Sequence, residues 1–250
     1  MVRLKDQVAI VTGAAGGFGA EISRRYVAEG AKVAVADMNE EGAKKVAAEL
    51  GANAFAIKCD VTKRADIDAL VAATMKNFGT LDIVVNNAGY SHPNQPMLET
   101  DEATFDRVLD VNIKSIYLMA MATVPILRAK KRGCIINIGS VSGMRPRPGL
   151  VWYSASKAAA NVLSKAMAAE LGPDNIRVNA VAPVMSPTGM FTLFSGVENT
   201  PENQKKFLAN IPLGRLATPA DIAKACVYLA SDDADFITGV EFPVDGGRSV

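Results

Sequence analysis

Tyr153 and Lys157 are the residues whose types and spacing best support chemistry, because they stand four positions apart in the run Tyr-Ser-Ala-Ser-Lys. On a helix, that spacing places both side chains on one face, about one turn apart. A phenol with a pKa of about 10 exchanges protons poorly at neutral pH, and a nearby ammonium favours its phenolate. The pair therefore predicts an acid/base role for Tyr153, with Lys157 lowering its pKa. An ordinary amphipathic helix with no catalytic role has the same spacing.

Two further polar residues can complete such a site. Ser140 comes directly after a predicted apolar strand. It can hydrogen-bond the substrate oxygen that exchanges a proton with Tyr153, while hydride passes to or from a nicotinamide. Asn112 lies inside a predicted helix over 101–128, where asparagine is a poor helix former. It can anchor a water that links Lys157 to solvent.

A nicotinamide needs a dinucleotide site, and the stretch VAIVTGAAGGFG near the N-terminus has the pattern for one. Its apolar start is typical of a buried parallel strand, and the glycines Gly13, Gly17 and Gly19 let a pyrophosphate approach the backbone where a helix begins. The spacing is G-x-x-x-G-x-G and not the commoner G-x-G-x-x-G, and a flexible turn could carry the same cluster. However, a second predicted strand over 33–36 ends in Asp37, which can accept hydrogen bonds from an adenosine ribose. The two features together predict dinucleotide binding.

Later strand ends supply further candidate contacts. Asp60 follows the third predicted strand and can reach an adenine amino group, although capping of a helix that begins near Arg64 explains this residue nearly as well. Asn86 and Asn87 follow the fourth strand, where two amides can fix backbone groups beside a cofactor.

Strands and helices alternate along the whole chain, which predicts one doubly wound α/β domain with a mostly parallel, seven-stranded sheet flanked by helices, a Rossmann fold. Predicted strands cover 8–11, 33–36, 54–58, 81–85, 134–138, 177–181 and 240–244, and predicted helices include 40–50, 64–78 and 219–230. We expect a cofactor half over about 1–130 and a catalytic and substrate half over about 131–250. Within the second half, the apolar stretch 183–212 is typical of a substrate lid.

Composition limits the partners. With 250 residues and 49% hydrophobic content, the chain can fill one core. A net charge of +1, with both signs interspersed, gives no field for nucleic acid or an acidic membrane, so we expect a small-molecule substrate.

Cysteine usage and the N-terminus indicate the compartment. Cys59, Cys134 and Cys226 lack the spacing of a disulfide framework or a zinc site, so we expect buried reduced thiols and no metal. The N-terminal apolar run is too short for a signal peptide, and no stretch of 18 apolar residues occurs. These features predict a soluble cytoplasmic protein.

The motifs together resemble the short-chain dehydrogenase/reductase family over essentially the whole chain. The matches occur in order and at the family's spacing: the turn from Thr12 to Gly19, Asn86 to Gly89, Asn112, Ser140, Tyr153 to Lys157, and Pro183 with Thr188. The resemblance implies that Asn112, Ser140, Tyr153 and Lys157 form a catalytic tetrad, that Lys157 also binds the nicotinamide ribose, that Thr188 meets the carboxamide, and that the protein is a homotetramer. Val184 replaces the usual glycine after Pro183, so the local backbone path departs from the family pattern. The predicted cofactor contacts are Gly13, Ala15, Gly17, Phe18, Gly19, Asp37, Asp60, Val61, Asn87, Ala88, Gly89, Tyr153, Lys157, Pro183 and Thr188.

The sequence also weighs against other functions. A serine hydrolase needs a G-x-S-x-G elbow, which Gly139 to Gly143 does not form, and the chain has one histidine. A catalytically silent dinucleotide-binding protein would not need the four polar residues. A 3-oxoacyl carrier-protein reductase using NADPH is the closer alternative, but such enzymes usually carry a basic residue where Ala15 stands. Ala15 and Asp37 therefore favour an NAD-linked dehydrogenase of a secondary alcohol, such as a sugar, polyol or hydroxy acid.

The substrate side offers less specific candidates. Arg145 and Arg147 lie shortly before Tyr153 and could bind an anionic or hydroxyl-rich substrate. Pro146 between them favours an extended backbone, so at most one of them points inward, and both could equally be surface arginines. Other candidate substrate contacts are His92, Asn94 and Gln95 from the loop after the fourth strand, and Met190 from the lid.

Overall fold

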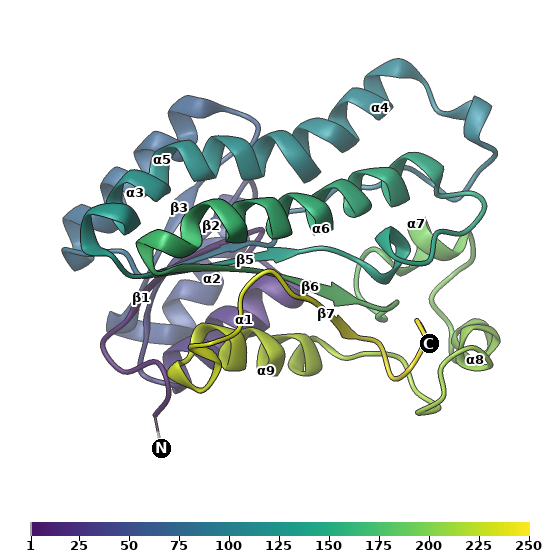
Figure 1. The fold of residues 1–250 in the computed structure, drawn as a ribbon. Helices are drawn as coiled ribbons and strands as arrows, with labels where there is room; N and C mark the ends of the chain where they lie inside the picture. Colours follow the sequence, from purple (N-terminus) through teal and green to yellow (C-terminus); the bar gives the residue numbers. More distant parts are fainter. Residues whose placement is uncertain (1) are drawn as a thin grey trace.

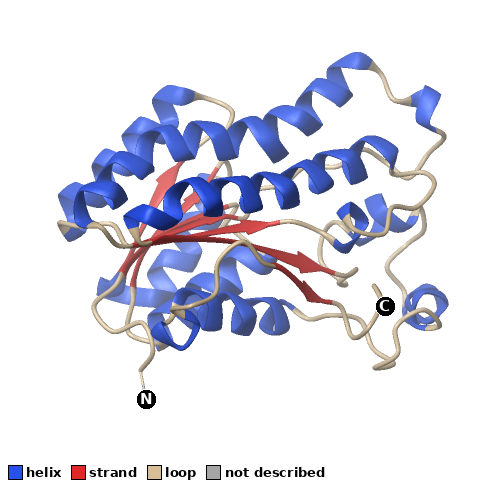
Figure 2. Cartoon of the chain, viewed as in Figure 1, coloured by secondary structure: helices blue, strands red, loops and turns tan. Residues whose placement is uncertain are grey.

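In the computed structural model, which describes residues 2–250, seven strands form one sheet in the order β3-β2-β1-β4-β5-β6-β7 (Figures 1 and 2). The strands are β1 (Val8–Thr12), β2 (Lys32–Asp37), β3 (Ala54–Lys58), β4 (Ile83–Asn86), β5 (Gly133–Ile138), β6 (Ile176–Pro183) and β7 (Glu241–Val244). Every neighbouring pair is parallel. The predicted fold class is confirmed.

Helices cover both faces of this sheet, which explains why the strands are mostly apolar. One face carries α1 (Gly17–Ala28), α2 (Glu40–Leu50) and α9 (Pro219–Ala230), and the other carries α3 (Arg64–Phe78), α5 (Ser115–Lys130) and α6 (Val151–Leu171) (Figure 1). Alternate residues of one strand enter opposite cores. Ala9 and Val11 of β1 belong to the core under α1 and α9, whereas Ile10 belongs to the core under α3.

The order of the strands reverses between β1 and β4, and this reversal positions the site. The chain runs outward from β1 to β2 and β3, and α3 then returns it to β4 on the other side of β1, with Ala9 opposite Ile83. Ligands of doubly wound sheets bind in the crevice at this switch point, beyond the carboxyl ends of the strands. The turn after β1 and the segment after β4 meet there.

The predicted helix over 101–128 is a composite. It consists of α4 (Glu102–Leu109), a π-helical turn over Asp110–Lys114 and α5, and Pro125 lies inside α5 without ending it. The π-helical turn contains Asn112, the residue whose poor helix propensity singled it out. Such turns insert one residue into a helix and commonly occur at functional sites.

By length and apolar composition alone, one helical run of 29 residues among those described, Glu102–Lys130, could cross a membrane. A single run of this kind is weak evidence, because a core helix of a soluble protein passes the same test. Here α5 lies against the sheet beside α3 and α6, and it contributes Met119 and Leu127 to the core (Figure 1).

The predicted lid over 183–212 contains two short helices, α7 (Phe191–Ser195) and α8 (Pro201–Leu208), beside the carboxyl ends of the strands (Figure 1). Phe191 is fully buried and meets Phe207 edge-on, with ring centroids 5.7 Å apart. Phe191 also forms a small core of its own with Ile211 and Leu216. The lid is therefore a well-packed segment with a small hydrophobic core of its own.

Candidate active site

A cavity of about 500 Å³ runs along the carboxyl ends of the strands. Its walls come from the glycine turn after β1, the ends of β2, β3 and β5, the segment after β4, the start of α6, and the lid. The sequence-predicted residues that line it are Gly13, Gly17, Phe18, Asp37, Asp60, Val61, Asn87, Ala88, Gly89, Ser140, Arg145, Arg147, Tyr153, Lys157, Pro183, Thr188 and Met190.

The glycine turn is shaped for close approach. Gly13 has φ +63°, and a Cβ there would lie 2.8 Å from the Cα of Ala88. A Cβ on Gly19 would lie 2.3 Å from the carbonyl oxygen of Gly13. Gly19 therefore packs behind the turn and does not line the cavity. The first turn of α1 has no side-chain cap and no acidic residue, so its N–H groups remain available to an anion.

Asn87 joins the end of β4 to this turn. Its Nδ2 donates to the carbonyl oxygens of Thr12 at 2.8 Å and Gly13 at 3.0 Å. The Thr12 hydroxyl in turn accepts from the backbone N–H groups of Asn87 and Ala88, both at 3.1 Å. Asn87 thus holds the two sides of the switch-point crevice together, and the residues present fit a dinucleotide whose phosphates lie against the turn.

Two carboxylates mark the other end of the cavity. Asp37 accepts from the N–H of Ala15 at 2.9 Å, so Ala15 contributes its backbone to the turn and is not itself in the cavity wall. Asp60 accepts from the N–H and hydroxyl of Thr62 at 3.0 and 2.7 Å. Helix α3 is preceded by Lys63, with no side-chain cap, so capping does not account for Asp60.

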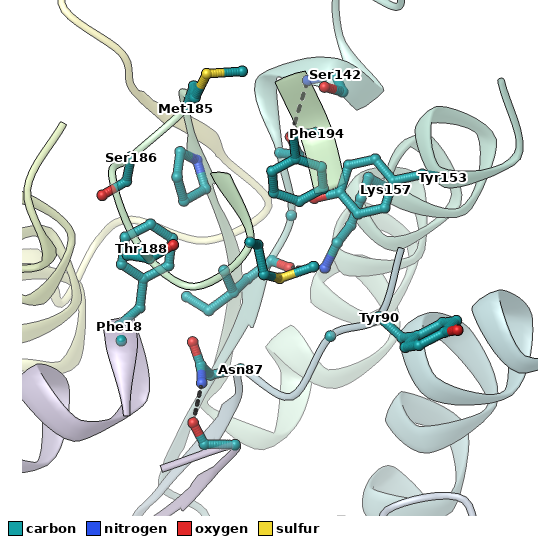
Figure 3. A pocket seen from close by; sticks show the side chains of 18 of the residues that line it. Phe18, Asn87, Tyr90, Ser142, Tyr153, Lys157, Met185, Ser186, Thr188 and Phe194 are labelled. Atoms are coloured by element: carbon teal, nitrogen blue, oxygen red, sulfur yellow. Dashed lines mark hydrogen bonds between the residues drawn. The ribbon is translucent and has the colours of Figure 1, made fainter. Parts of the chain in front are cut away.

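The three residues Ser140, Tyr153 and Lys157 gather beyond β5 and line the cavity. Figure 3 shows Tyr153 and Lys157. Tyr153 and Lys157 are 7% and 5% exposed. The Lys157 ammonium donates to the carbonyl oxygen of Ile138 at 2.7 Å and lies 5.9 Å from the centroid of the Tyr153 ring. The cavity thus brings a phenol, a hydroxyl and an ammonium together in a place shielded from bulk water.

The pKa values in this group differ from the expectation. Burial raises the pKa of Tyr153 to about 12, while the hydroxyl of Ser140 and the charge of Arg147 act in the opposite direction. Burial also lowers the pKa of Lys157 to about 8. The predicted lowering of the Tyr153 pKa by Lys157 is not found here, because desolvation of the phenolate outweighs the neighbouring charges.

Asn112 lies beside this group without lining the cavity. Its Oδ1 accepts from the N–H of Tyr90 at 2.9 Å, and its Nδ2 donates to the Tyr90 carbonyl oxygen and the Ser156 hydroxyl, each at 2.9 Å. A Cβ built on Gly89 would lie 3.6 Å from Asn112 Oδ1 and 3.5 Å from Lys157 Nζ. Asn112 therefore fixes the segment after β4 against α6.

His92 and Asn94 do not line the cavity, contrary to the expectation that they contact substrate. His92 is fully buried, with Nδ1 2.7 Å from the Pro93 carbonyl oxygen and Nε2 accepting from the N–H of Tyr153 at 3.4 Å. Asn94 instead holds the lid, donating from its Nδ2 to the carbonyl oxygen of Phe194 at 3.0 Å. Gln95, also outside the cavity wall, reaches Thr100 at 3.4 Å.

Arg145 and Arg147 both line the cavity, although at most one of them was expected to point inward, and they bind different backbone partners. The exposed Arg145 donates from Nη1 to the carbonyl oxygens of Arg248 at 3.0 Å and Val250 at 3.3 Å, which directs it to the C-terminal segment. Arg147 is half-buried and donates from Nη2 to the carbonyl oxygen of Phe194 in the lid. Of the two, Arg147 is the one whose charge acts on Tyr153.

Sequence reasoning did not single out Arg107, Ser142 and Arg248, which also line the cavity. Arg248 lies two residues from the C-terminus, and only the fold brings it to the strand ends. The lid was expected to contribute apolar residues, and Phe194 is the most direct example. Its ring lies against that of Tyr153, with centroids 4.9 Å apart (Figure 3).

The three cysteines are free and buried, as predicted. Among residues 2–250, no group of three or more His, Cys, Asp or Glu side chains is placed to hold a metal ion.

Comparison with known proteins defines the class. A family model described as "Enoyl-(Acyl carrier protein) reductase" matches residues 13–249. The chain belongs to the short-chain dehydrogenase/reductase family of oxidoreductases, and the resemblance inferred from the motifs is confirmed.

Individual relatives are similar over their whole length. The 4-formylbenzenesulfonate dehydrogenase of Comamonas testosteroni is 49% identical, covering 100% of both chains. The 2,5-dichloro-2,5-cyclohexadiene-1,4-diol dehydrogenase of Sphingobium indicum is 41% identical, covering 99% of this chain and 98% of the relative. The crystal structure of 3-ketoacyl-(acyl-carrier-protein) reductase from Brucella melitensis complexed with NADH superimposes with a TM-score of 0.93 at 41% identity, covering 99% of this chain and 100% of that one.

Proposed function

We propose that this protein is an NAD(H)-dependent oxidoreductase that interconverts a secondary alcohol, of the sugar, polyol or hydroxy acid type, and its ketone. The observation that carries the proposal is the placement of Tyr153, Ser140 and Lys157 on the wall of the same cavity as the glycine turn and Asp37. A nicotinamide bound there supplies hydride exchange at the substrate carbon. In oxidation, two electrons and a proton leave the carbon as hydride, and the hydroxyl proton leaves the oxygen.

The residues of this chain handle that second proton. Tyr153 takes the hydroxyl proton during oxidation and returns it during reduction. Ser140 holds the substrate oxygen by a hydrogen bond, so that the oxygen faces the phenol. Lys157 binds the nicotinamide ribose and favours the phenolate when its ammonium approaches the phenol oxygen. Asn112 positions the segment beside Lys157, where a water can connect the ammonium to solvent.

The cofactor choice follows from charge. Asp37 stands at the end of β2, where the carboxylate can accept from both ribose hydroxyls of NAD and would repel the 2′-phosphate of NADP. Asp60 and Val61 are proposed to meet the adenine, Phe18 with the first turn of α1 the pyrophosphate, and Pro183 and Thr188 the carboxamide. The NADH in the Brucella melitensis structure supports a nicotinamide cofactor.

Other parts of the proposal rest on the family resemblance and on composition. They are a homotetrameric assembly, a cytoplasmic location, and a single domain whose cofactor half spans about 1–130 and whose catalytic half spans about 131–250.

A 3-oxoacyl-[acyl-carrier-protein] reductase using NADPH is the second candidate. It is favoured by the similarity to the Brucella melitensis structure, which is that of a 3-ketoacyl-(acyl-carrier-protein) reductase. The presence of Asp37 and of Ala15 in the glycine turn opposes it. A catalytically silent dinucleotide-binding protein is the third candidate, and the Tyr153 group opposes that one.

A single screen separates the three candidates. Secondary alcohols, sugars, polyols and hydroxy acids are offered with NAD and with NADP in parallel, and 3-oxoacyl thioesters are offered with NADH and NADPH. We expect NAD-dependent oxidation of at least one alcohol, lost in Tyr153→Phe. Turnover confined to 3-oxoacyl thioesters with NADPH would establish the second candidate, and dinucleotide binding without any turnover the third.

A further inference from the structure

Charge is distributed unevenly along the cavity. The acidic residues in its wall are Asp37 and Asp60, which follow β2 and β3. Beyond β5, where Tyr153 and the lid lie, the wall contains Arg145, Arg147 and Arg248 and no acidic side chain. Because β2 and β3 lie on the opposite side of the switch point from β5 and β6, the carboxylates face the adenosine end and the arginines face the substrate end.

At the substrate end of the cavity, the Arg147 side chain is held by contacts with the lid. Its guanidinium lies 5.8 Å from the centroid of the Phe207 ring and donates one N–H to the carbonyl oxygen of Phe194. A guanidinium has five N–H donors in a fixed fork, so most of its donors remain free for a ligand. Burial lowers the pKa of the Arg147 guanidinium, and the positive charge of Arg248 lowers this pKa further. The interaction with Tyr153 acts in the opposite direction and raises it. A half-buried cation with no carboxylate partner is costly, and an anion beside it offsets that cost.

The position of Arg147 connects it to the reacting group. The residue whose carbonyl oxygen it binds, Phe194, lays its own ring against Tyr153 (Figure 3). An oxyanion bound by Arg147 and an oxygen that faces Tyr153 can therefore belong to one molecule. The cavity wall is more apolar than polar. Its apolar residues beyond β5 and in the lid include Val141, Leu150, Met185, Met190, Phe194 and Phe207, and its polar ones there include Ser140, Ser142, Ser186 and Thr188. Such a wall fits an apolar body better than a polyhydroxylated one.

We propose that Arg147 determines substrate specificity by binding a carboxylate or sulfonate carried by an apolar, ring-type substrate, through two parallel N–H···O hydrogen bonds. This inference rests on the proposed alcohol–ketone activity and narrows its substrate class from hydroxyl-rich compounds to apolar monoanions. Arg145 is less suited to the role, because its side chain is exposed to solvent and directed to the C-terminal segment, whereas Arg147 is half-buried against the lid.

The test uses ketones that differ only in charge. 4-Acetylbenzoate and 4-acetylbenzenesulfonate carry the anion, and 4-acetylbenzamide is the neutral counterpart. Affinity is measured by calorimetry on the protein saturated with NADH, and reduction is followed in parallel by loss of NADH absorbance. The variants are Arg147→Gln, which removes the charge, Arg147→Lys, which keeps the charge but not the fork, and Arg145→Gln, which removes a nearby exposed arginine.

Arg147 also helps to hold the lid through Phe194, so a further control is needed. Asn94→Ala removes the other side-chain hydrogen bond to the same carbonyl oxygen and leaves every arginine in place. A loosened lid weakens charged and neutral ligands alike, whereas a lost anion contact weakens the charged ligands alone.

We expect the wild-type protein to bind at least one of the two anions at least tenfold more tightly than the amide. Arg147→Gln should abolish this preference, Arg147→Lys should retain part of it, and Arg145→Gln should change it less than threefold. Absence of the preference in the wild type, or its survival in Arg147→Gln, overturns the inference. Binding that depends on Arg147 without any reduction by NADH would instead defeat the proposed activity and leave the anion site standing.

Discussion

The carboxylate of Asp37, at the end of β2, accepts a hydrogen bond from the backbone N–H of Ala15 in the glycine turn, with an N···O distance of 2.9 Å. This contact fixes a negative charge beside the turn that receives a dinucleotide. A second oxygen of the same carboxylate accepts from the N–H of Asn39 at 2.8 Å. Both oxygens of the carboxylate are thus oriented by backbone N–H groups.

The first prediction concerns cofactor selectivity. A 2′-phosphate placed against this carboxylate suffers a repulsion of about 2–3 kcal/mol, which corresponds to roughly 30- to 150-fold in kcat/KM in favour of NAD. Asp37→Asn keeps a hydrogen-bond acceptor for Ala15 and removes the charge, so the preference should shrink while NAD remains a substrate. Combining Asp37→Ala with Ala15→Arg should erode or reverse it. Equal kcat/KM of the wild type with NAD and with NADP would contradict this prediction.

The second prediction concerns proton transfer. Tyr153→Phe removes the phenolic hydroxyl and keeps the ring that lies against Phe194, so the lid contact should persist. We expect turnover to fall at least about 100-fold, in line with the usual contribution of general acid–base catalysis, with NADH affinity nearly unchanged. Steady-state kinetics and NADH fluorescence titration measure the two quantities. Wild-type turnover in this variant would refute the assignment of Tyr153.

Local signals in the sequence predict most of the helices and strands. Gly79 ends α3 with φ +78°, and Thr218 with Asp221 forms a capping box at the start of α9. Such features fix element ends through neighbouring residues alone, and the predicted helices 64–78 and 219–230 match the structure. The predicted strand over 54–58 matches too, because an apolar run between turns is also a local feature.

Features that depend on distant contacts were not predictable in this way. The π-helical turn at Asn112 is held by Tyr90 and Ser156, which lie far from it in the sequence. His92 looked like a cavity residue because it follows β4, but its ring turns inward to meet the N–H of Tyr153. The orientation of the Asn94 side chain is likewise set by its hydrogen bond to Phe194 of the lid, which lies 100 residues away in the sequence.

The third prediction links the charge of Lys157 to stability. The pKa of Lys157 is lowered by burial from 10.5 to about 8, which corresponds to a cost of about 3 kcal/mol for holding the ammonium in the folded protein. Below about pH 8 the lysine is protonated in both states, so the full cost applies. Between about pH 8 and 10.5 the folded state has released the proton and the unfolded state has not, so wild-type stability rises with pH.

Lys157→Met should therefore raise the free energy of unfolding at pH 7, by about 1–2 kcal/mol once the lost hydrogen bond to Ile138 is counted. The gain over wild type should shrink as the pH rises toward 10.5. Urea denaturation of the cofactor-free protein at pH 7 and pH 10 measures both values. Lys165→Met, an exposed position on the same helix, serves as the control and should show no such convergence. A gain that grows with pH would contradict the argument.

The fourth prediction concerns the packing behind the glycine turn. A methyl group on Gly19 would lie 2.3 Å from the carbonyl oxygen of Gly13 and 2.9 Å from the Cα of Ala14. Both are backbone atoms, so the turn itself must shift to admit the methyl group. Gly172, which follows α6 with helical φ −54° and ψ −43°, has nothing within 4 Å of an added Cβ. Replacement of glycine by alanine can therefore be compared at a crowded site, Gly19, and at an open site, Gly172.

Gly19→Ala should lower the free energy of unfolding by about 1–3 kcal/mol, the usual cost of overpacking, and weaken NADH binding at least tenfold, because the displaced turn no longer presents its N–H groups to the pyrophosphate. Gly172→Ala should be neutral or slightly stabilising, since alanine loses less conformational entropy on folding, and NADH affinity should not change. Urea denaturation and fluorescence titration of both variants provide the comparison. If Gly19→Ala binds NADH as tightly as Gly172→Ala does, the turn tolerates displacement and does not act as the phosphate cradle.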